Sequence, residues 1–272
     1  MAFRRRRKKK DRKKFRGVYL LPNLITTASL FGGFLAIVFA IEGRFLAAAW
    51  AIFVSLILDG LDGRIARMTH STSSFGVQYD SLSDLVAFGV APALLVYLWA
   101  LKDYGRFGWV AAFLYVVCGA LRLARFNVQV GSMDPRYFNG FPIPAAAMVV
   151  ATTLGFYYRI GEWAFLRHTF ILVMIYLLAF FMVSNIKFFS LKKWELFKRH
   201  PFQSLVAVVL FFVVVAVEPE IVGFFFMLTY LASGALSSYI YYRSRPEAVP
   251  EKAPEETVAT PEKPLEHPPA SP

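Results

Sequence analysis

The chain has 272 residues, of which 57% are hydrophobic and 17% aromatic. This composition excludes an ordinary soluble domain and indicates a polytopic membrane protein. The formal net charge of +12 is typical of some nucleic-acid-binding proteins, but here the basic residues gather in tails and loops beside apolar segments. That distribution indicates membrane topology, and we therefore expect no nucleic-acid partner.

The two ends of the chain differ in composition from its centre. Residues 4–16 carry eleven Lys or Arg in thirteen positions, which predicts a disordered basic cytoplasmic arm over 1–17. This arm either binds anionic lipid headgroups or acts only as a topology signal. Residues 246–272 are rich in Pro and Glu and predict a second disordered segment, which we place at 244–272.

Eight apolar segments lie between these ends, each close to the roughly 20 residues that a helix needs to cross a bilayer. They occupy residues 24–41, 45–67, 78–101, 108–128, 141–158, 169–187, 202–217 and 221–242. The first exceeds a signal-peptide core in length, so we interpret it as an uncleaved span. We expect an all-α integral membrane protein, a bundle of about eight transmembrane helices, with a core over 18–190 and a basic interfacial link plus two further helices over 191–243.

The basic residues also predict the orientation of the bundle. With both termini in the cytoplasm, 25 of the 30 Lys and Arg residues lie on the cytoplasmic side and five on the other. This distribution agrees with the positive-inside rule. Because the chain carries no recognisable targeting peptide, we expect it in a bacterial inner (cytoplasmic) membrane.

Four aspartates lie inside or beside the second and third apolar segments, where a bare ionised carboxylate costs about 2.5 to 3.5 kcal/mol at the bilayer centre. Asp59 and Asp62 are spaced i, i+3, and Asp80 and Asp84 i, i+4, so each pair shares one face of its helix. A short polar connection predicts antiparallel neighbours with converging carboxylates. Such an all-oxygen cluster suits Mg²⁺, Mn²⁺ or Ca²⁺, and Mg²⁺ usually leaves coordination positions for substrate phosphates. These residues predict a metal and phosphate site at a lipid interface.

Further polar residues gather on the same predicted side. Asn23 and Thr26 open the first span, where capping of the helix start is one role for them. Arg122 and Arg125 are spaced i, i+3, and two guanidiniums that point together favour a phosphate or carboxylate. The alternative for these arginines is membrane anchoring by snorkelling.

The spacing D-x-x-D-G-x-x-A-R-x8-G-x3-D-x3-D, from Asp59 to Asp84, resembles the signature of the CDP-alcohol phosphatidyltransferases. These membrane enzymes move a phosphatidyl group from CDP-diacylglycerol to an alcohol. All eight fixed positions match, a far more specific signal than a lone glycine motif. Residues 78–92, 122–127 and 138–144 resemble the phosphatidylserine synthase branch of this family, and the likeness extends over about residues 18–190.

The resemblance implies a six-helix catalytic core with two additional C-terminal helices, a homodimer, and transfer of the phosphatidyl group to L-serine to give phosphatidylserine and CMP. Together with the chemistry of the cluster, it implies Mg²⁺ or Mn²⁺ held by Asp59, Asp62, Asp80 and Asp84, with Asp84 also the general base. The nucleotide of CDP-diacylglycerol is assigned to Asp59, Gly63, Ala66, Arg67, Gly76, Asn23 and Thr26. The acceptor or the lipid phosphate is assigned to Arg122, Arg125, Asn127 and Asn139.

Two alternative functions stay open. A sibling transferase that uses glycerol 3-phosphate or inositol phosphate would keep every aspartate and change the acceptor pocket, which would need more basic residues. An ion-coupled transporter also places carboxylates in the membrane. A transporter, however, is expected to have broken helices near the midplane and internal repeats, and the sequence shows neither clearly.

Overall fold

The computed structural model describes residues 20–69, 71, 73–129, 137–161, 164–189 and 217–243. Its main elements are helices: α1 (Leu20–Ile41), α2 (Phe45–Met68), α3 (Ser74–Asp84), α4 (Ala91–Val96), α5 (Arg106–Gln129), α6 (Ile143–Ile160), α7 (Ala164–Val183) and α10 (Pro219–Arg243). Two π-helical segments, η2 (Leu85–Val90) and η3 (Tyr97–Leu101), and a 3₁₀ turn, η4 (Lys102–Tyr104), extend α3 and α4 into one continuous rod.

Five of the described helical stretches are long and apolar enough to cross a membrane, namely 20–41, 45–68, 74–104, 106–129 and 143–160. Shorter apolar stretches lie in α7 and α10. The prediction of an all-α integral membrane bundle is therefore confirmed. Seven of the eight predicted spans fall on described helices. The basic arm, most of the basic link, the C-terminal tail and all but the last residue of the segment 202–217 lie outside the described residues.

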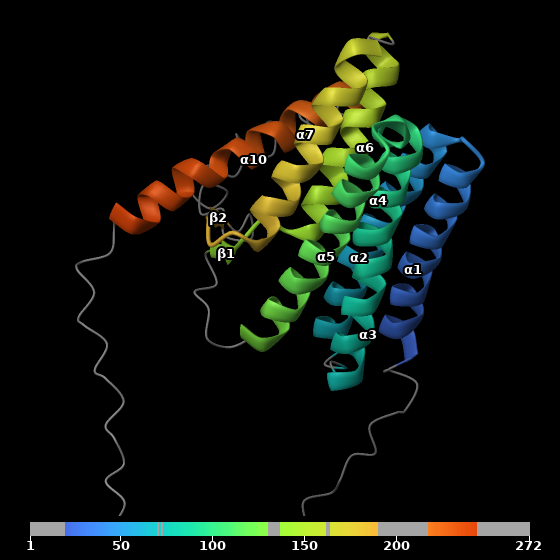
Figure 1. Ribbon diagram of the computed structural model, residues 1–272. Coiled ribbons are helices and arrows are strands. Elements are labelled where there is room, and N and C mark those ends of the chain that lie inside the picture. The colour runs from blue at the N-terminus through green and yellow to red at the C-terminus, as the bar shows by residue number, and fades with distance from the viewer. Residues whose placement is uncertain are drawn as a thin grey trace, which may run out of the picture.

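Small residues let the first helices pack with close backbone contact. In Figure 1, α1, α2 and the rod that contains α3 and α4 run side by side. A Cβ atom added at Gly33 of α1 would lie only 2.6 Å from Cα of Ala87 in η2, so no larger residue fits there without movement. Ala36 and Ala40 continue the same buried face. Such small-residue contacts are how membrane helices gain packing energy without a hydrophobic effect between them.

The rod changes its helical hydrogen bonding directly after Asp84, where η2 begins. Pro92 has no amide N–H to donate to the carbonyl of Phe88, four residues earlier. The hydroxyl of the fully buried Tyr115, on α5, donates to that carbonyl at 3.2 Å. The irregular segment is thereby held against α5, close to the aspartates.

A short antiparallel pair of strands, β1 (Tyr137–Asn139) and β2 (Lys187–Phe189), joins the segments before α6 and after α7. The sequence patterns do not predict it. Gly140 follows β1 with a positive φ of 76°, a conformation that favours glycine. Its amide donates to the carbonyl of Ile186 at 2.9 Å, so this turn is fixed to the segment before β2.

The C-terminal helix α10 lies across the bundle at a steep tilt, as its orange ribbon shows in Figure 1. At its start, the guanidinium of Arg159, at the end of α6, forms an ion pair with Glu218 at 2.6 Å. Farther along, Gly234 lies so close to the ring of Phe188 on β2 that no Cβ would fit. Helix α10 is therefore docked both on α6 and on the strand pair.

Candidate active site

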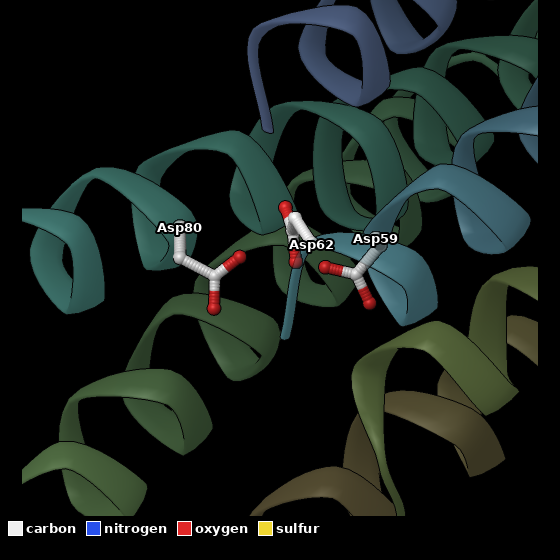
Figure 2. A group of neighbouring side chains, drawn as sticks. All are labelled: Asp59, Asp62 and Asp80. Carbon is white, nitrogen blue, oxygen red and sulfur yellow. The ribbon is translucent and has the colours of Figure 1, made fainter. Parts of the chain in front are cut away.

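Three carboxylates converge where α2 and α3 meet. Asp59 and Asp62 lie on α2 and Asp80 on α3, and each offers an oxygen within 4.8 Å of the oxygens of the other two. Figure 2 shows Asp80 extending from its helix toward the pair on α2. The turn that makes this possible is closed by Ser73, whose hydroxyl accepts a hydrogen bond from the amide of Gly76 at 3.0 Å and caps α3.

Asp84 lies beside this group rather than within it. Its carboxyl group approaches the carboxyl group of Asp59 within hydrogen-bonding reach, as that of Asp80 also does. The structure thus brings all four aspartates together, with three of them forming the tighter cluster.

The cluster fits a hard divalent cation. All of its donors are carboxylate oxygens, the ligands that such ions prefer. The Oδ1 atom of Asp80 is buried and has no hydrogen-bond partner in the described part of the chain. Nor does any described Lys or Arg form an ion pair with one of the four aspartates. Neighbouring carboxylates that form no ion pair with a described Lys or Arg favour a bound cation.

Helix α1 supports the cluster through Thr26. The Thr26 hydroxyl donates to Oδ2 of Asp62 at 2.7 Å and also lies 3.1 Å from the carbonyl oxygen of Pro22. Since α1 already begins at Leu20, the interpretation of Thr26 as a cap of the helix start is wrong. The hydrogen bond from its hydroxyl restricts the rotamers of the Asp62 side chain and so orients one carboxylate of the cluster.

A cavity of about 180 Å³ opens beside Asp62 and Asp80, between α1, α2 and α3. Six of the seven residues predicted to contact the nucleotide line it, and Asp59 does not. The six are Asn23, Thr26, Gly63, Ala66, Arg67 and Gly76. A Cβ added at Gly76 would lie 3.2 Å from the Ser73 hydroxyl and 3.4 Å from Oδ1 of Asn23, so glycine keeps this wall of the cavity open.

The residues predicted for the acceptor have different surroundings. Arg122 is buried, with Nε lacking a hydrogen-bond partner among the described residues. Arg125 instead donates to Oδ1 of Asn185 at 3.0 Å and to the carbonyl of Val183, the last residue of α7. Arg125 is therefore held by residues at and after the end of α7, whereas the Nε atom of Arg122 has no such partner among the described residues.

The two predicted asparagines are also separated. Asn127 donates from Nδ2 to the Ser81 hydroxyl at 2.9 Å, which ties the end of α5 to α3 one residue from Asp80. Asn139 lies in β1, opposite Lys187. Asn127 is thus near the aspartates, while Asn139 belongs to the strand pair.

Sequence reasoning missed a contact close to this site. Tyr79 shares a hydrogen bond of 2.8 Å with the hydroxyl of Thr27, which links α3 to α1. The position of Tyr79 inside the motif was a usable signal.

Comparisons with known proteins agree with this geometry. The family model for CDP-alcohol phosphatidyltransferase matches residues 19–183. A Helicobacter pylori (strain ATCC 700392 / 26695) protein named CDP-diacylglycerol–serine O-phosphatidyltransferase is 41% identical over 225 residues, covering 80% of this chain and 91% of the relative.

Two further relatives, which match shorter stretches of the chain, carry related names. A Mycobacterium tuberculosis (strain ATCC 25618 / H37Rv) protein with the same name is 44% identical over 154 residues, 54% of either chain. The archaetidylserine synthase of Methanothermobacter thermautotrophicus is 36% identical over 178 residues, 65% of this chain and 72% of the relative. With the family model matching more than half of its length, this chain belongs to the CDP-alcohol phosphatidyltransferase family.

Proposed function

We propose that this membrane protein transfers the phosphatidyl group of CDP-diacylglycerol to the hydroxyl of L-serine, giving phosphatidylserine and CMP. The observation that carries the proposal is the cluster of Asp59, Asp62 and Asp80, with carboxylate oxygens within 4.8 Å of one another. Serine as the acceptor is supported by the names of the relatives, which include CDP-diacylglycerol–serine O-phosphatidyltransferases.

The aspartate cluster would hold Mg²⁺ or Mn²⁺ through Asp59, Asp62 and Asp80. When bound, the cation neutralises the diphosphate of CDP-diacylglycerol and stabilises the departing CMP. Thr26 keeps the Asp62 carboxylate in place through its 2.7 Å hydrogen bond. Asn23, Gly63, Ala66, Arg67 and Gly76 line the adjoining cavity and would contact the cytidine nucleotide.

Asp84 would act as the general base. It accepts the proton of the serine hydroxyl while the serine oxygen attacks the phosphorus that carries the diacylglycerol. The bond between that phosphorus and the oxygen that links it to the CMP phosphate then breaks, and CMP leaves. Its position beside the three-carboxylate group supports this role, because a carboxylate with less metal contact is the better base.

Arg122 would bind the carboxylate of serine, since its guanidinium is buried and has a donor without a partner among the described residues. Arg125 and Asn127 would shape the same region by holding α5 against α7 and α3. The positive-inside distribution supports a cytoplasmic position for the site, in a bacterial inner membrane. There serine and CMP exchange directly with the cytosol.

The test is CMP release by the purified protein in detergent with CDP-diacylglycerol and Mn²⁺ or Mg²⁺. L-serine, glycerol 3-phosphate, inositol phosphate and no acceptor are compared, with Asp84→Asn and the matched control Asp103→Asn, which lies on η4 at the other end of the rod. We expect release that requires both serine and metal, reduced about 10²- to 10⁴-fold by Asp84→Asn and unchanged by Asp103→Asn.

If CMP were released only with glycerol 3-phosphate or inositol phosphate, the acceptor would be that of a sibling transferase and not serine. If folded protein released CMP with none of the acceptors, the transferase assignment itself would fail. Full activity of Asp84→Asn would remove the proposed base and leave the reaction intact.

A further inference from the structure

The cavity beside the aspartates is lined by Ser71, a residue at one of the eight unspecified positions between Arg67 and Gly76 of the motif. We infer that the Ser71 hydroxyl selects cytosine over uracil by accepting a hydrogen bond from the exocyclic amino group of the base. The inference rests on the proposed function, because it takes this cavity as the nucleotide site, and it adds to that function a residue that determines specificity.

A chain of hydrogen bonds fixes the direction of the Ser71 hydroxyl. The Thr69 hydroxyl lies 2.7 Å from the carbonyl oxygen of Ile65, to which it donates because a carbonyl can only accept. A hydroxyl carries a single proton, so in the 2.6 Å hydrogen bond between Thr69 and Ser71 the donor is Ser71. The Ser71 oxygen is left with lone pairs only, and toward a ligand it can act only as an acceptor.

The position of Ser71 fits a contact with the base rather than with the phosphates. Its amide donates to the carbonyl of Ala66 at 3.0 Å, which holds Ser71 at the end of α2, and only 5% of the residue is exposed. Ala66 lies one helical turn, about 6 Å, along α2 from Asp62. With the diphosphate at Asp62 and Asp80, the ribose separates the base from the phosphates and places it toward this end of the cavity.

Cytosine and uracil differ in the group that would meet this oxygen. Cytosine carries an amino group, which donates, where uracil carries a carbonyl oxygen, which accepts. An oxygen that can only accept pairs with the amino group, whereas opposite uracil both oxygens would stay without a hydrogen bond, which is costly in a buried position. A site built to hydrogen-bond one group rejects the analogue that lacks it.

The other polar side chains that line the cavity do not make this distinction. Thr26 donates to Asp62 and so lies with the cation cluster. Asn23 and Ser73 each have both a donor and an acceptor and can satisfy either base. Arg67 only donates, which suits a phosphate or the 2-carbonyl oxygen that both pyrimidines share. Discrimination between the two bases is therefore assigned to Ser71.

The test is the affinity of the purified protein in detergent for CDP and UDP with Mg²⁺, measured by titration calorimetry. We expect the wild type to bind CDP about 10-fold or more tightly than UDP. Ser71→Ala should weaken CDP binding about fivefold or more without weakening UDP binding, which brings the two affinities within about twofold. The matched control is Ser55→Ala on α2, whose hydroxyl donates to the carbonyl of Ala51 in its own helix at 3.0 Å. This control should keep the wild-type preference.

A second variant, Thr69→Val, changes the exposed partner and leaves Ser71 in place. Without the Thr69 oxygen, the Ser71 proton loses its acceptor and can turn toward the ligand, where it can donate to the carbonyl oxygen of uracil. We expect the affinity for UDP to rise about fivefold or more and the affinity for CDP to change by less than about twofold. A purely structural role of Thr69 would weaken the binding of both nucleotides alike.

Several results would overturn the inference, each in protein with wild-type thermal unfolding in detergent. They are a wild type that binds CDP no more tightly than UDP or does not bind it, and an unchanged preference in Ser71→Ala or in Thr69→Val. Equal losses for CDP and UDP in Ser71→Ala would assign Ser71 to the ribose, which both nucleotides share, and would also contradict it. Failure of the proposed function is distinguishable, because the wild-type protein would then prefer CDP and still release no CMP with serine.

Discussion

At the scale of single residues, Thr26 connects the first helix to the aspartate cluster. Replacing it with valine keeps the shape of the side chain and removes the 2.7 Å hydrogen bond to Asp62. Removing a hydrogen-bond partner of a metal ligand commonly lowers metal affinity or activity about 10- to 100-fold. We therefore expect Thr26→Val to raise the Mn²⁺ or Mg²⁺ concentration for half-maximal CMP release at least about 10-fold.

The control for this substitution is Thr152→Val on α6. The Thr152 hydroxyl donates only to carbonyls of its own helix, at 2.7 Å to Met148 and 3.3 Å to Val149. The metal concentration that the Thr152→Val protein requires should match that of the wild type. A Thr26→Val protein with wild-type metal dependence would show that Asp62 needs no support from α1.

Residue spacing predicted the convergence of the aspartates, because i, i+3 and i, i+4 positions share a helix face whatever the rest of the fold does. Arg122 and Arg125 have the same kind of spacing, but Arg125 is hydrogen-bonded to Asn185 and Val183, whereas the Nε atom of Arg122 has no partner among the described residues. The carbonyl of Val183, at the end of α7, accepts a hydrogen bond from Arg125. That contact joins segments far apart in the chain, so local spacing could not reveal it.

At the scale of elements, the contact between α1 and η2 sets the distance of the first helix from the rod. Gly33→Ala would place a Cβ 2.6 Å from the backbone of Ala87. Such overpacking typically costs about 1–3 kcal/mol of stability. We therefore expect Gly33→Ala to unfold at a lower fraction of SDS in mixed detergent and SDS micelles. Gly60→Ala is the stability control, since its added Cβ meets no atom within 4 Å. Equal midpoints for the two variants would contradict close packing at Gly33.

Apolar length predicted where the helices lie, but not their internal irregularities. The switch to π-helical hydrogen bonding over Leu85–Val90 depends on Pro92 together with Tyr115 from another helix. The β1–β2 pair depends on contact between the segments before α6 and after α7. Both features require the tertiary structure, and neither has a periodic pattern of its own.

At the scale of the whole molecule, the charge distribution predicts that the aspartate end of α2 faces the cytoplasm. The sequence has one cysteine, the buried Cys118, so the Cys118→Ser variant is a protein without thiols to which single cysteines can be added. Glu42→Cys, between α1 and α2, should react with a membrane-impermeant maleimide in intact spheroplasts. Met68→Cys, at the exposed end of α2, should react only after lysis. The reverse pattern would place the site on the other side of the membrane.

The most direct test of the reaction uses L-serine labelled with ¹⁸O in its hydroxyl group, with CDP-diacylglycerol and metal. Attack by the serine oxygen on the phosphorus that carries the diacylglycerol predicts that mass spectrometry finds the label in phosphatidylserine and none in CMP. Labelled cytidine phosphoserine together with phosphatidic acid would mean attack on the other phosphorus. Unlabelled phosphatidylserine would mean that the serine oxygen is not the nucleophile, and either result would contradict the mechanism.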